Sequence, residues 1–281
     1  MKKIIAITCI LILPSLLFAL NCDICKRPSF NLIQAGDKRL CPTCYGNIPR
    51  CAGCGELVIK QGWKSKSDDR IYCNKCYNSK DVCDVCGVPL PSGQGVVFEK
   101  NRKICEKCKV TSIIDSKEAE EIYKSIIEFA SKTYNMRLKH NTPIKMISRD
   151  EMKKLAEGKI KNADRLFGLF KKDKKGNFAI YFLFGTPRYI TRATIAHEFA
   201  HAWQEENCVK GQSEIVSEGF AEWFAAKILY NFNEREGAKI VETRQDVYGD
   251  GFRYFANLEE KSNADSVINH AKYIKDICKK K

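Results

Sequence analysis

The chain is 281 residues long and 44% hydrophobic, and its 48 Lys+Arg against 34 Asp+Glu give a formal net charge of +14. This length is enough for two or three domains. The basic surplus is spread as isolated lysines without interleaved aromatic residues, which argues against a nucleic-acid-binding surface. Beyond residue 20 no apolar run is long enough to span a membrane, which excludes a polytopic membrane protein.

Residues 1–19 have the pattern of a signal peptide. Lys2 and Lys3 precede an apolar run that Pro14 interrupts, and Ala19 offers a small residue for cleavage. The run is also short for a membrane span. We therefore predict a secreted or periplasmic protein that is free of the membrane after cleavage, with an uncleaved anchor as the alternative.

Residues 20–110 contain a cysteine array. Twelve of the 15 cysteines form six Cys-x2-Cys pairs, separated in turn by 15, 6, 18, 6 and 18 residues. This alternation indicates three repeated modules, each with two knuckles joined by a hairpin, which is the spacing of a tetrahedral four-cysteine zinc site. Taken in chain order, the predicted sites are Cys22, Cys25, Cys41 and Cys44 (zinc 1); Cys51, Cys54, Cys73 and Cys76 (zinc 2); and Cys83, Cys86, Cys105 and Cys108 (zinc 3).

Two other arrangements of the array are open from the sequence. A disulfide framework suits a secreted chain, although regular Cys-x2-Cys doublets fit metal knuckles better, and cross-braced pairing of the knuckles would also give zinc sites. Three zinc ions with twelve thiolates lower the formal charge by six, to about +8. Few apolar residues lie between the knuckles, so we expect zinc to supply much of the folding free energy, on the order of 10 kcal/mol per site. Outside the array, Cys208 and Cys278 are interpreted as buried thiols, with a disulfide between them as the alternative.

From residue 111 the composition changes to a cysteine-poor mixed domain. Apolar residues at helical spacing predict a helix over 116–134, capped by Asp115 or Ser116. A strand is expected over 143–148 and a short helix from Arg149 to Glu157, ending at Gly158. Two apolar runs, 165–170 and 178–184, flank a Gly-Asn turn and predict a β-hairpin.

The second strand of this hairpin leads into the helix that carries the strongest motif. We expect one edge of the 178–184 strand to remain free, so that an extended peptide can add to it by backbone hydrogen bonds. Its apolar face is expected to belong to the core.

His197-Glu198-Phe199-Ala200-His201 is an H-E-x-x-H motif inside an apolar helix. Two histidines four residues apart project from one helix face, where their imidazoles can bind one zinc ion at roughly 2.0–2.1 Å. Glu198 lies beside them, where its carboxylate can reach a water on the metal. A solvated helix face is the alternative, but buried polar groups need partners and a metal supplies one.

A catalytic zinc needs a third protein ligand. The metzincin extension is absent because Gln204 and Asn207 occupy its glycine and last histidine positions, and His140 and His270 are remote without ligand spacing. A carboxylate is therefore expected from a second helix, over 213–227, where the acidic residues recur every four positions: Glu214, Glu218 and Glu222.

The segment from Ser217 to Glu222 resembles the ligand segment of gluzincins, zinc peptidases whose third ligand is a glutamate on a second helix. This resemblance and its central position favour Glu218 as the ligand, and imply that Glu222 accepts the outer N–H of a ligand histidine. A solvated charged face remains the alternative for Glu214 and Glu222. We expect Gly219 to let the two helices approach closely.

The cysteine array and the motif domain together resemble the plant DA-one family of LIM-domain zinc peptidases. The likeness is carried by 178–203, with Phe184-Gly185-Thr186-Pro187-Arg188 and the H-E-x-x-H helix, and continues through Glu218-Gly219 and the segment 248–253, Tyr-Gly-Asp-Gly-Phe-Arg. It implies a gluzincin-type endopeptidase in which His197, His201 and Glu218 bind the catalytic zinc and Glu198 is the acid/base. An oxyanion donor is also expected, with Tyr248, Arg253 and Tyr254 as candidates.

The chain also departs from that family. Ubiquitin-interacting motifs are absent, and all twelve predicted ligands of the array are cysteines, with six residues between the sites. The family's activation by ubiquitin and its substrates are therefore not carried over. The modules are LIM-like or ribbon-like.

The sequence thus predicts an α+β protein with a signal peptide (1–19), three tandem LIM-like zinc modules (20–110) and a small zinc peptidase domain (111–281). The predicted cofactors are one catalytic and about three structural Zn²⁺ ions. The expected partners are a protein or peptide substrate and a protein bound by the modules, without nucleic acid. The alternative function is an interaction adaptor with an inactive peptidase scaffold.

Overall fold

The computed structural model describes residues 19–64, 70–79, 81–90, 95–99, 102–156 and 165–277. The predicted signal peptide falls almost wholly outside these residues, as do Gly158 and Cys278. The chain divides into two compact units, one comprising 1–82 and 87–94 and the other 83–86 and 95–281. This division falls inside the cysteine array, because the knuckles and hairpin of the third module group with the C-terminal domain.

The first unit contains two modules of the same design, each a short hairpin followed by one or two helical turns. The elements are β1 (Leu20–Asn21), β2 (Pro28–Ser29), β3 (Ile33–Ala35), β4 (Lys38–Leu40), α1 (Pro42–Asn47), β5 (Gly62–Lys64), β6 (Ile71–Cys73) and α2 (Asn74–Tyr77). Their cores are small: Cys22, Ala35 and Leu40 are buried in the first, and Cys51, Val58, Tyr72 and Cys76 in the second. Cores of this size cannot offset the entropy of ordering the chain, so the modules depend on what their cysteines bind.

The third module repeats the design within the second unit. Its hairpin is β7 (Val96–Glu99) and β8 (Arg102–Ile104), and its helix is α3 (Glu106–Val110). The next strand, β9 (Ser112–Ile113), pairs with β13 (Thr186–Pro187), directly before the H-E-x-x-H helix. The module is thereby joined to the C-terminal domain by backbone hydrogen bonds.

The C-terminal domain confirms the predicted elements closely. They are α4 (Ser116–Tyr134), with Asp115 accepting the Lys117 N–H as its cap, β10 (Ile144–Ile147), α5 (Arg149–Ala156), β11 (Gly168–Lys172) and β12 (Phe178–Leu183). The α+β class is confirmed, but the sheet of this domain is mixed, because β10 runs parallel to β12 while β11 is antiparallel to it.

The strand expected to offer a free edge does not have one. β12, which covers most of 178–184, is the central strand in the order β10-β12-β11, so both of its edges are paired. Among the described residues, β10 and β11 are the two edge strands of this sheet. β11 packs against the H-E-x-x-H helix. The prediction that one edge of 178–184 remains free is therefore wrong.

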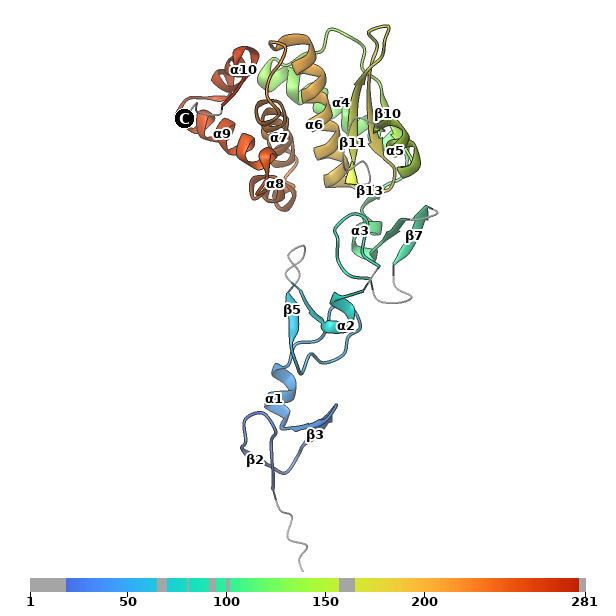
Figure 1. Ribbon diagram of the computed structural model, residues 1–281, viewed down its shortest axis with the longest axis vertical. Coiled ribbons are helices and arrows are strands. Elements are labelled where there is room, and N and C mark those ends of the chain that lie inside the picture. The colour runs from blue at the N-terminus through green and yellow to red at the C-terminus, as the bar shows by residue number, and fades with distance from the viewer. Residues whose placement is uncertain are drawn as a thin grey trace, which may run out of the picture. The chain divides into compact units, whose positions relative to one another are not determined.

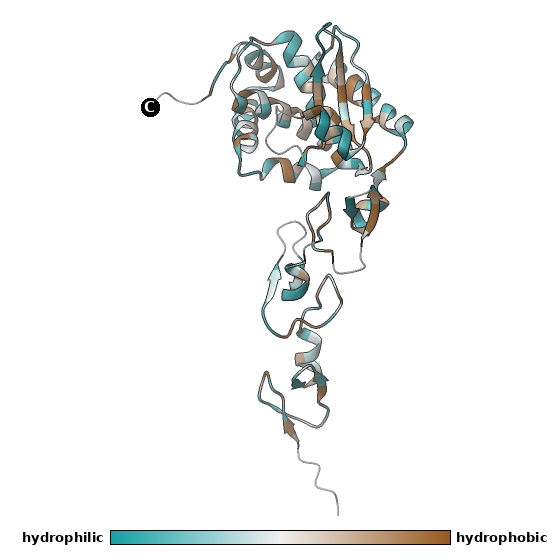
Figure 2. Ribbon diagram, turned by 45° about the vertical axis from the view of Figure 1, so that its right-hand side comes forward, coloured by the Kyte–Doolittle hydropathy of each residue, from teal (hydrophilic) through white to brown (hydrophobic). Residues whose placement is uncertain are grey.

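Two long helices form the centre of the domain, α6 (Arg188–Asn207) and α7 (Glu214–Asn231), and they lie side by side beside the sheet (Figure 1). α4 packs on α6, while α8 (Arg235–Glu242), α9 (Val247–Lys261) and α10 (Ala264–Tyr273) complete the core. α7 buries residues around most of its surface, including Phe220, Trp223 and Phe224. Figure 2 shows hydrophobic residues along the strands of the sheet. Within the described part of the chain, no helix is both long and apolar enough to cross a membrane.

Gly219 serves a different contact from the one expected. A Cβ built on it would lie 2.4 Å from the Cα and carbonyl carbon of Gly251, on α9, and not against α6. A Cβ on Gly251 would in turn meet the carbonyl oxygen of Ile215 at 2.1 Å. The two glycines therefore let α7 and α9 cross at backbone contact, which places the start of α9 beside the acidic face of α7.

We predict that Gly219→Ala destabilises the protein, because the new methyl group can only be accommodated by separating α7 from α9. Overpacking of this kind costs about 1–3 kcal/mol in the free energy of unfolding, measurable by denaturant unfolding. The matched control is Gly46→Ala in α1, where an added Cβ meets nothing within 4 Å. Equal stability of Gly219→Ala and the wild type would contradict the tight crossing.

Candidate functional site: four metal-ligand clusters

The twelve array cysteines gather into three groups of four, in the sequential pairing predicted from the sequence. In each group one ligand atom from every residue lies within 4.8 Å of the others. The Cys25–Cys41, Cys54–Cys73 and Cys86–Cys105 sulfurs are 3.9, 4.0 and 3.8 Å apart. Tetrahedral zinc with Zn–S bonds of about 2.3 Å requires sulfurs about 3.8 Å apart, whereas a disulfide needs about 2.05 Å. No described cysteine forms a disulfide, so the geometry fits three structural zinc ions and not a disulfide framework.

Backbone N–H groups point at the first cysteine of each module. Cys73 N–H donates to the Cys51 sulfur at 3.2 Å, and Cys105 N–H donates to the Cys83 sulfur at 3.3 Å. In the first module the N–H of Cys41 has the same effect and lowers the pKa of Cys22 to about 6. These donors stabilise the thiolate, which is the form that binds zinc.

The fourth cluster joins the two central helices. His197 and His201 project from α6 and Glu218 from α7. The two Nε2 atoms are 3.0 Å apart, and the Glu218 Oε2 atom lies 3.1 Å from that of His197 and 3.3 Å from that of His201. A tetrahedral ion with bonds of about 2.1 Å would set such ligand atoms about 3.4 Å apart. The triangle therefore has the size that a zinc ion requires.

An acceptor faces the Nδ1 atom of each imidazole, on the side away from Glu218. The Gln204 amide donates to the carbonyl of Ser217, so its oxygen faces His201 and accepts the Nδ1–H at 3.0 Å. The Nδ1 of His197 faces the buried Glu222 carboxylate at 3.7 Å, an ion-pair distance. Both rings thus turn Nε2 toward the Glu218 carboxylate. Once Nε2 is unprotonated, as a metal ligand must be, three lone pairs converge on one point, which is unfavourable unless a cation lies there.

Arg244 supports the carboxylate behind His197. Its Nη1 is 2.6 Å from Glu222 Oε1, its Nη2 pairs with Asp246 at 2.7 Å, and its guanidinium lies 4.3 Å from the centre of the Tyr248 ring. The side chain of Glu222 is only 7% exposed, and a buried carboxylate needs such a partner.

Glu198 lies outside the ligand triangle and against the sheet. It is buried, and its Oε2 accepts the backbone N–H of Phe170 on β11 at 2.6 Å. Gly168 makes this approach possible, because a Cβ there would lie 2.3 Å from Thr194 Cγ2 and 3.0 Å from the Glu198 carboxylate. Burial raises the pKa of Glu198, which makes its carboxylate a stronger proton acceptor.

The charges of the cluster are strongly coupled. Burial lowers the pKa of His197, but Glu218, Glu222 and Glu198 together raise it to about 9. Burial likewise raises the pKa of Glu218, but hydrogen bonds with His197 and His201 hold it well below its usual range. The site therefore stabilises positive charge between its rings and carboxylates.

The three candidate oxyanion donors lie in different surroundings. The Tyr248 ring stacks on the His197 ring with centroids 6.3 Å apart, and burial and Glu218 raise its pKa to about 12, so the hydroxyl keeps its proton. Arg253 instead donates to the backbone carbonyls of Glu242 and Arg244. Tyr254 bonds to His270 at 2.7 Å. Only Tyr248 lies against the cluster.

The remaining predicted residues lie away from the cluster. Glu214 is exposed in the first turn of α7. His140 bonds to Glu206 at 2.7 Å. Cys208 is half-buried and free, and burial raises its pKa to about 12.

No protein-family profile matches the chain, and no solved structure matches it. Among curated proteins it is similar to Protein DA1 of Arabidopsis thaliana, at 20% identity over 67% of this chain and 48% of the relative. It is also similar to Protein DA1-related 7 of the same plant (24%; 72% and 43%) and to LIM domain-containing protein HDR3 of Oryza sativa subsp. japonica (24%; 46% and 33%).

The chain is a distant homologue of these plant proteins. It spans less than half the length of each of the three, so only part of each relative has a counterpart here. Its three four-cysteine clusters agree with LIM-like zinc modules.

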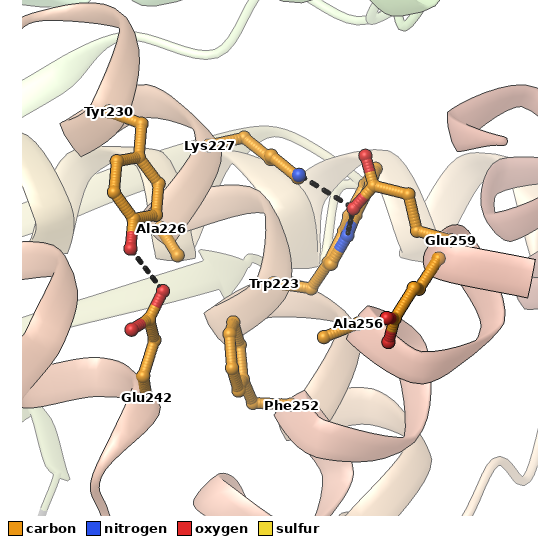
Figure 3. A pocket seen from close by; sticks show the side chains of 9 residues that line it. Trp223, Ala226, Lys227, Tyr230, Glu242, Phe252, Ala256 and Glu259 are labelled. Carbon is orange, nitrogen blue, oxygen red and sulfur yellow. Dashed lines mark hydrogen bonds and ion pairs between the residues drawn. The ribbon is translucent and has the colours of Figure 1, made fainter.

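A cavity of about 320 Å³ lies between α7, α8 and α9 (Figure 3). Trp223 lines it, and the pairs Tyr230–Glu242 and Lys227–Glu259 bridge its sides. No residue of the His–His–Glu cluster lines this cavity, so it is a separate feature of the domain.

Four residues of the site were not found from the sequence. Gln204 follows His201 by three positions, which places it on the same helix face, and this spacing could have indicated it. Arg244, Phe170 and Gly168 reach the cluster from other elements, Phe170 through its backbone N–H. No sequence pattern announces contacts of that kind.

We predict that Gln204→Ala weakens zinc binding at the His–His–Glu cluster by roughly 10- to 100-fold, because His201 loses the acceptor that fixes its tautomer. Competition with a chelator measures this affinity. Asn207→Ala is the matched control, since that amide bonds only to the Trp203 carbonyl one turn away on the same helix. Unchanged affinity in Gln204→Ala would show that the amide does not orient the ring.

Proposed function

We propose that this chain is a zinc-dependent endopeptidase of the gluzincin type. The observation that carries the proposal is the convergence of three lone pairs, from His197, His201 and Glu218, beside a buried glutamate that lies against an edge strand. A structural metal site would not need a glutamate beside the ligands. An inactive scaffold would need neither the ligands nor that glutamate. The distant similarity to the DA1-type proteins agrees with this assignment.

The ligands of the catalytic ion would be His197, His201 and Glu218. Bound zinc supplies Lewis acidity, which lowers the pKa of water and polarises a carbonyl group. Gln204 and Glu222 hold the two imidazoles in the tautomer that leaves Nε2 free for the ion.

Glu198 is the proposed general base and acid. Its carboxylate takes a proton from the attacking water as the new C–O bond forms at the scissile carbonyl. It then gives this proton to the leaving amine as the C–N bond breaks. Its buried position and raised pKa suit both halves of this transfer, while the Phe170 N–H holds the carboxylate in place.

The substrate is proposed to lie along β11 as an added strand. β11 presents its outer edge to the site, since the Phe170 N–H that points away from β12 reaches Glu198. An extended peptide adds to such an edge through backbone hydrogen bonds, which suits cleavage within a protein chain. This replaces 178–184 by 168–172 as the substrate strand.

Tyr248 is the proposed donor to the oxyanion. It stacks on His197 and keeps its proton at neutral pH. Arg244 lies over its ring and fixes its position. A hydroxyl donor at this point stabilises the charge that develops on the substrate oxygen.

The first two zinc modules are proposed to bind a protein partner or the substrate, because they are LIM-like modules beside the proposed peptidase domain.

A secreted or periplasmic location is also proposed, from the signal-peptide pattern of residues 1–19. Fractionation of cells with and without that segment tests the location: retention of the intact chain in the cytoplasm would refute it.

We predict that Glu198→Gln retains zinc but loses proteolysis, because the amide cannot accept the proton from water. The expected loss in kcat is roughly 10²- to 10⁴-fold, measured on an unfolded protein substrate, with about four zinc ions per chain in both proteins. His201→Ala is the companion variant, expected to hold three ions. Undiminished cleavage by Glu198→Gln would refute its role, and three zinc ions in the wild type would favour an adaptor with an inactive scaffold.

We predict that Tyr248→Phe lowers kcat by roughly 10²- to 10³-fold, the effect of removing one oxyanion donor. The ring still stacks on His197, so zinc content and KM should stay near the wild-type values. Tyr254→Phe is the matched control, because its hydroxyl bonds to His270 instead. Equal kcat values for Tyr248→Phe and the wild type would exclude the hydroxyl.

A further inference from the structure

The third zinc module differs from the first two in what surrounds it. Its knuckles and hairpin, 83–86 and 95–110, belong to the same compact unit as the His–His–Glu cluster, whereas 87–94 and the other two modules form the other unit. In Figure 1, α3 of this module lies directly next to β13, which ends where the H-E-x-x-H helix begins.

The backbone after α3 completes the start of α6. Thr111 accepts the N–H of Arg188, the first residue of α6, at 2.8 Å, and Ile113 accepts the N–H of Gly185 at 3.0 Å. The first N–H groups of a helix have no partner within it, and Pro187 at the cap position offers no side-chain acceptor. The segment that leaves the zinc module therefore serves as the cap of the active-site helix.

Arg102, on β8 of the module, makes the second connection. It is 2% exposed, and its guanidinium donates to Asp84 at 2.9 Å and to the carbonyl oxygens of Phe184 and Gly185 at 2.6 and 3.4 Å. Asp84 also pairs with Arg149 of α5 at 2.9 Å. A buried guanidinium is thus shared between the zinc knuckle and the turn that leads into α6.

Phe98 makes the third connection. Its ring packs against that of Phe184, with centroids 5.7 Å apart, and a Cβ on Gly185 would lie 2.4 Å from it. Gly185 has a φ of +68°, so the turn needs glycine both for its backbone and for this contact. The hairpin of the module and the turn before α6 are therefore closely packed.

The second module offers a comparison at the same positions of the repeat. Arg102 and Asp84 stand at the positions that Arg70 and Ala52 occupy in the second module. The second module thus has alanine where the third has the aspartate that pairs with Arg102. Arg50, at the entry to the second module, donates to the Gly55 carbonyl of its own knuckle.

We propose that the third module is a brace for the active-site helix, in which Arg102 is a positioning residue. Zinc at Cys83, Cys86, Cys105 and Cys108 fixes the hairpin and knuckle that carry Arg102, Phe98 and Asp84. These residues hold the Phe184–Gly185 turn, and with it the start of the helix that carries His197, Glu198 and His201. The catalytic consequence rests on the proposed peptidase function, but the mechanical coupling does not.

Hydrogen exchange of the zinc-loaded full chain tests the coupling. Arg102→Gln keeps all the cysteines, so its zinc content should be unchanged. We expect the amides of 185–196 to exchange at least about tenfold faster, the effect of losing charged hydrogen bonds. Arg102→Lys should fall between the two proteins, because one ammonium group can satisfy only part of the set. Cys108→Ser should lose one zinc ion and show the same acceleration.

Arg50→Gln and Cys76→Ser are the matched controls in the second module, and they should alter exchange only within that module. Wild-type exchange of 185–196 in both Arg102→Gln and Cys108→Ser would overturn the brace, as would equal acceleration in the controls. If Cys108→Ser unfolds the whole unit, Arg102→Gln decides.

Kinetics separate this inference from the proposed function. In Arg102→Gln we expect kcat to fall about tenfold or more at unchanged KM, since the catalytic helix is displaced while the β11 edge is not. Faster exchange with undiminished kcat would overturn the positioning role. Faster exchange in a chain whose wild type cleaves no protein would support the brace while the peptidase function fails.

Discussion

The convergence of two imidazole nitrogens and one carboxylate oxygen, 3.0–3.3 Å apart, is the constraint on which the C-terminal domain depends. With both nitrogens unprotonated, their lone pairs and the carboxylate repel one another, and water screens them only in part because the three side chains are half-buried. A divalent cation reverses the sign of this interaction. Much of the surrounding structure keeps the atoms in place for it: the Gln204 amide, the Glu222–Arg244 pair, and the contact of Glu198 with β11.

The crossing of α7 and α9 also helps to fix the positions of the residues at the metal site. Gly219 and Gly251 bring the backbones of α7 and α9 into contact, so the helix with the Glu218 ligand and the helix with Tyr248 are held at one spacing. A side chain at either position would separate them. The tight crossing and the metal site are therefore two parts of one arrangement: the ligands come from α6 and α7, and the neighbouring tyrosine comes from α9.

Zinc carries a different share of the stability in each unit. The first two modules have only a few buried apolar residues each, so the four-cysteine sites replace a hydrophobic core. The third module has the same four-cysteine design but adds a buried arginine that belongs equally to the neighbouring domain. The same four-cysteine module thus folds around zinc in the first unit and, with a few different side chains, also packs against the C-terminal domain in the second.

The sequence by itself determined what depends on local spacing. Cysteine intervals gave the three four-cysteine modules, while the structure chose the sequential pairing over the cross-braced one. The three-residue gap between His197 and His201 gave the shared helix face. The apolar periods gave α4 and β12 almost to their ends, and they placed α7 and β11 with ends that differ by up to four residues. These features are local because a helix or a knuckle repeats the same geometry wherever it forms.

The tertiary structure alone decided which elements meet. β10 pairs with β12 as a parallel strand, so β12 has no free edge. β11 is the edge strand that lies next to Glu198. Gly219 faces α9 instead of α6, and Arg244 reaches Glu222 from 22 residues away. Contacts of this kind follow from how whole faces pack together, and packing depends on shape across the core, which a one-dimensional pattern does not record.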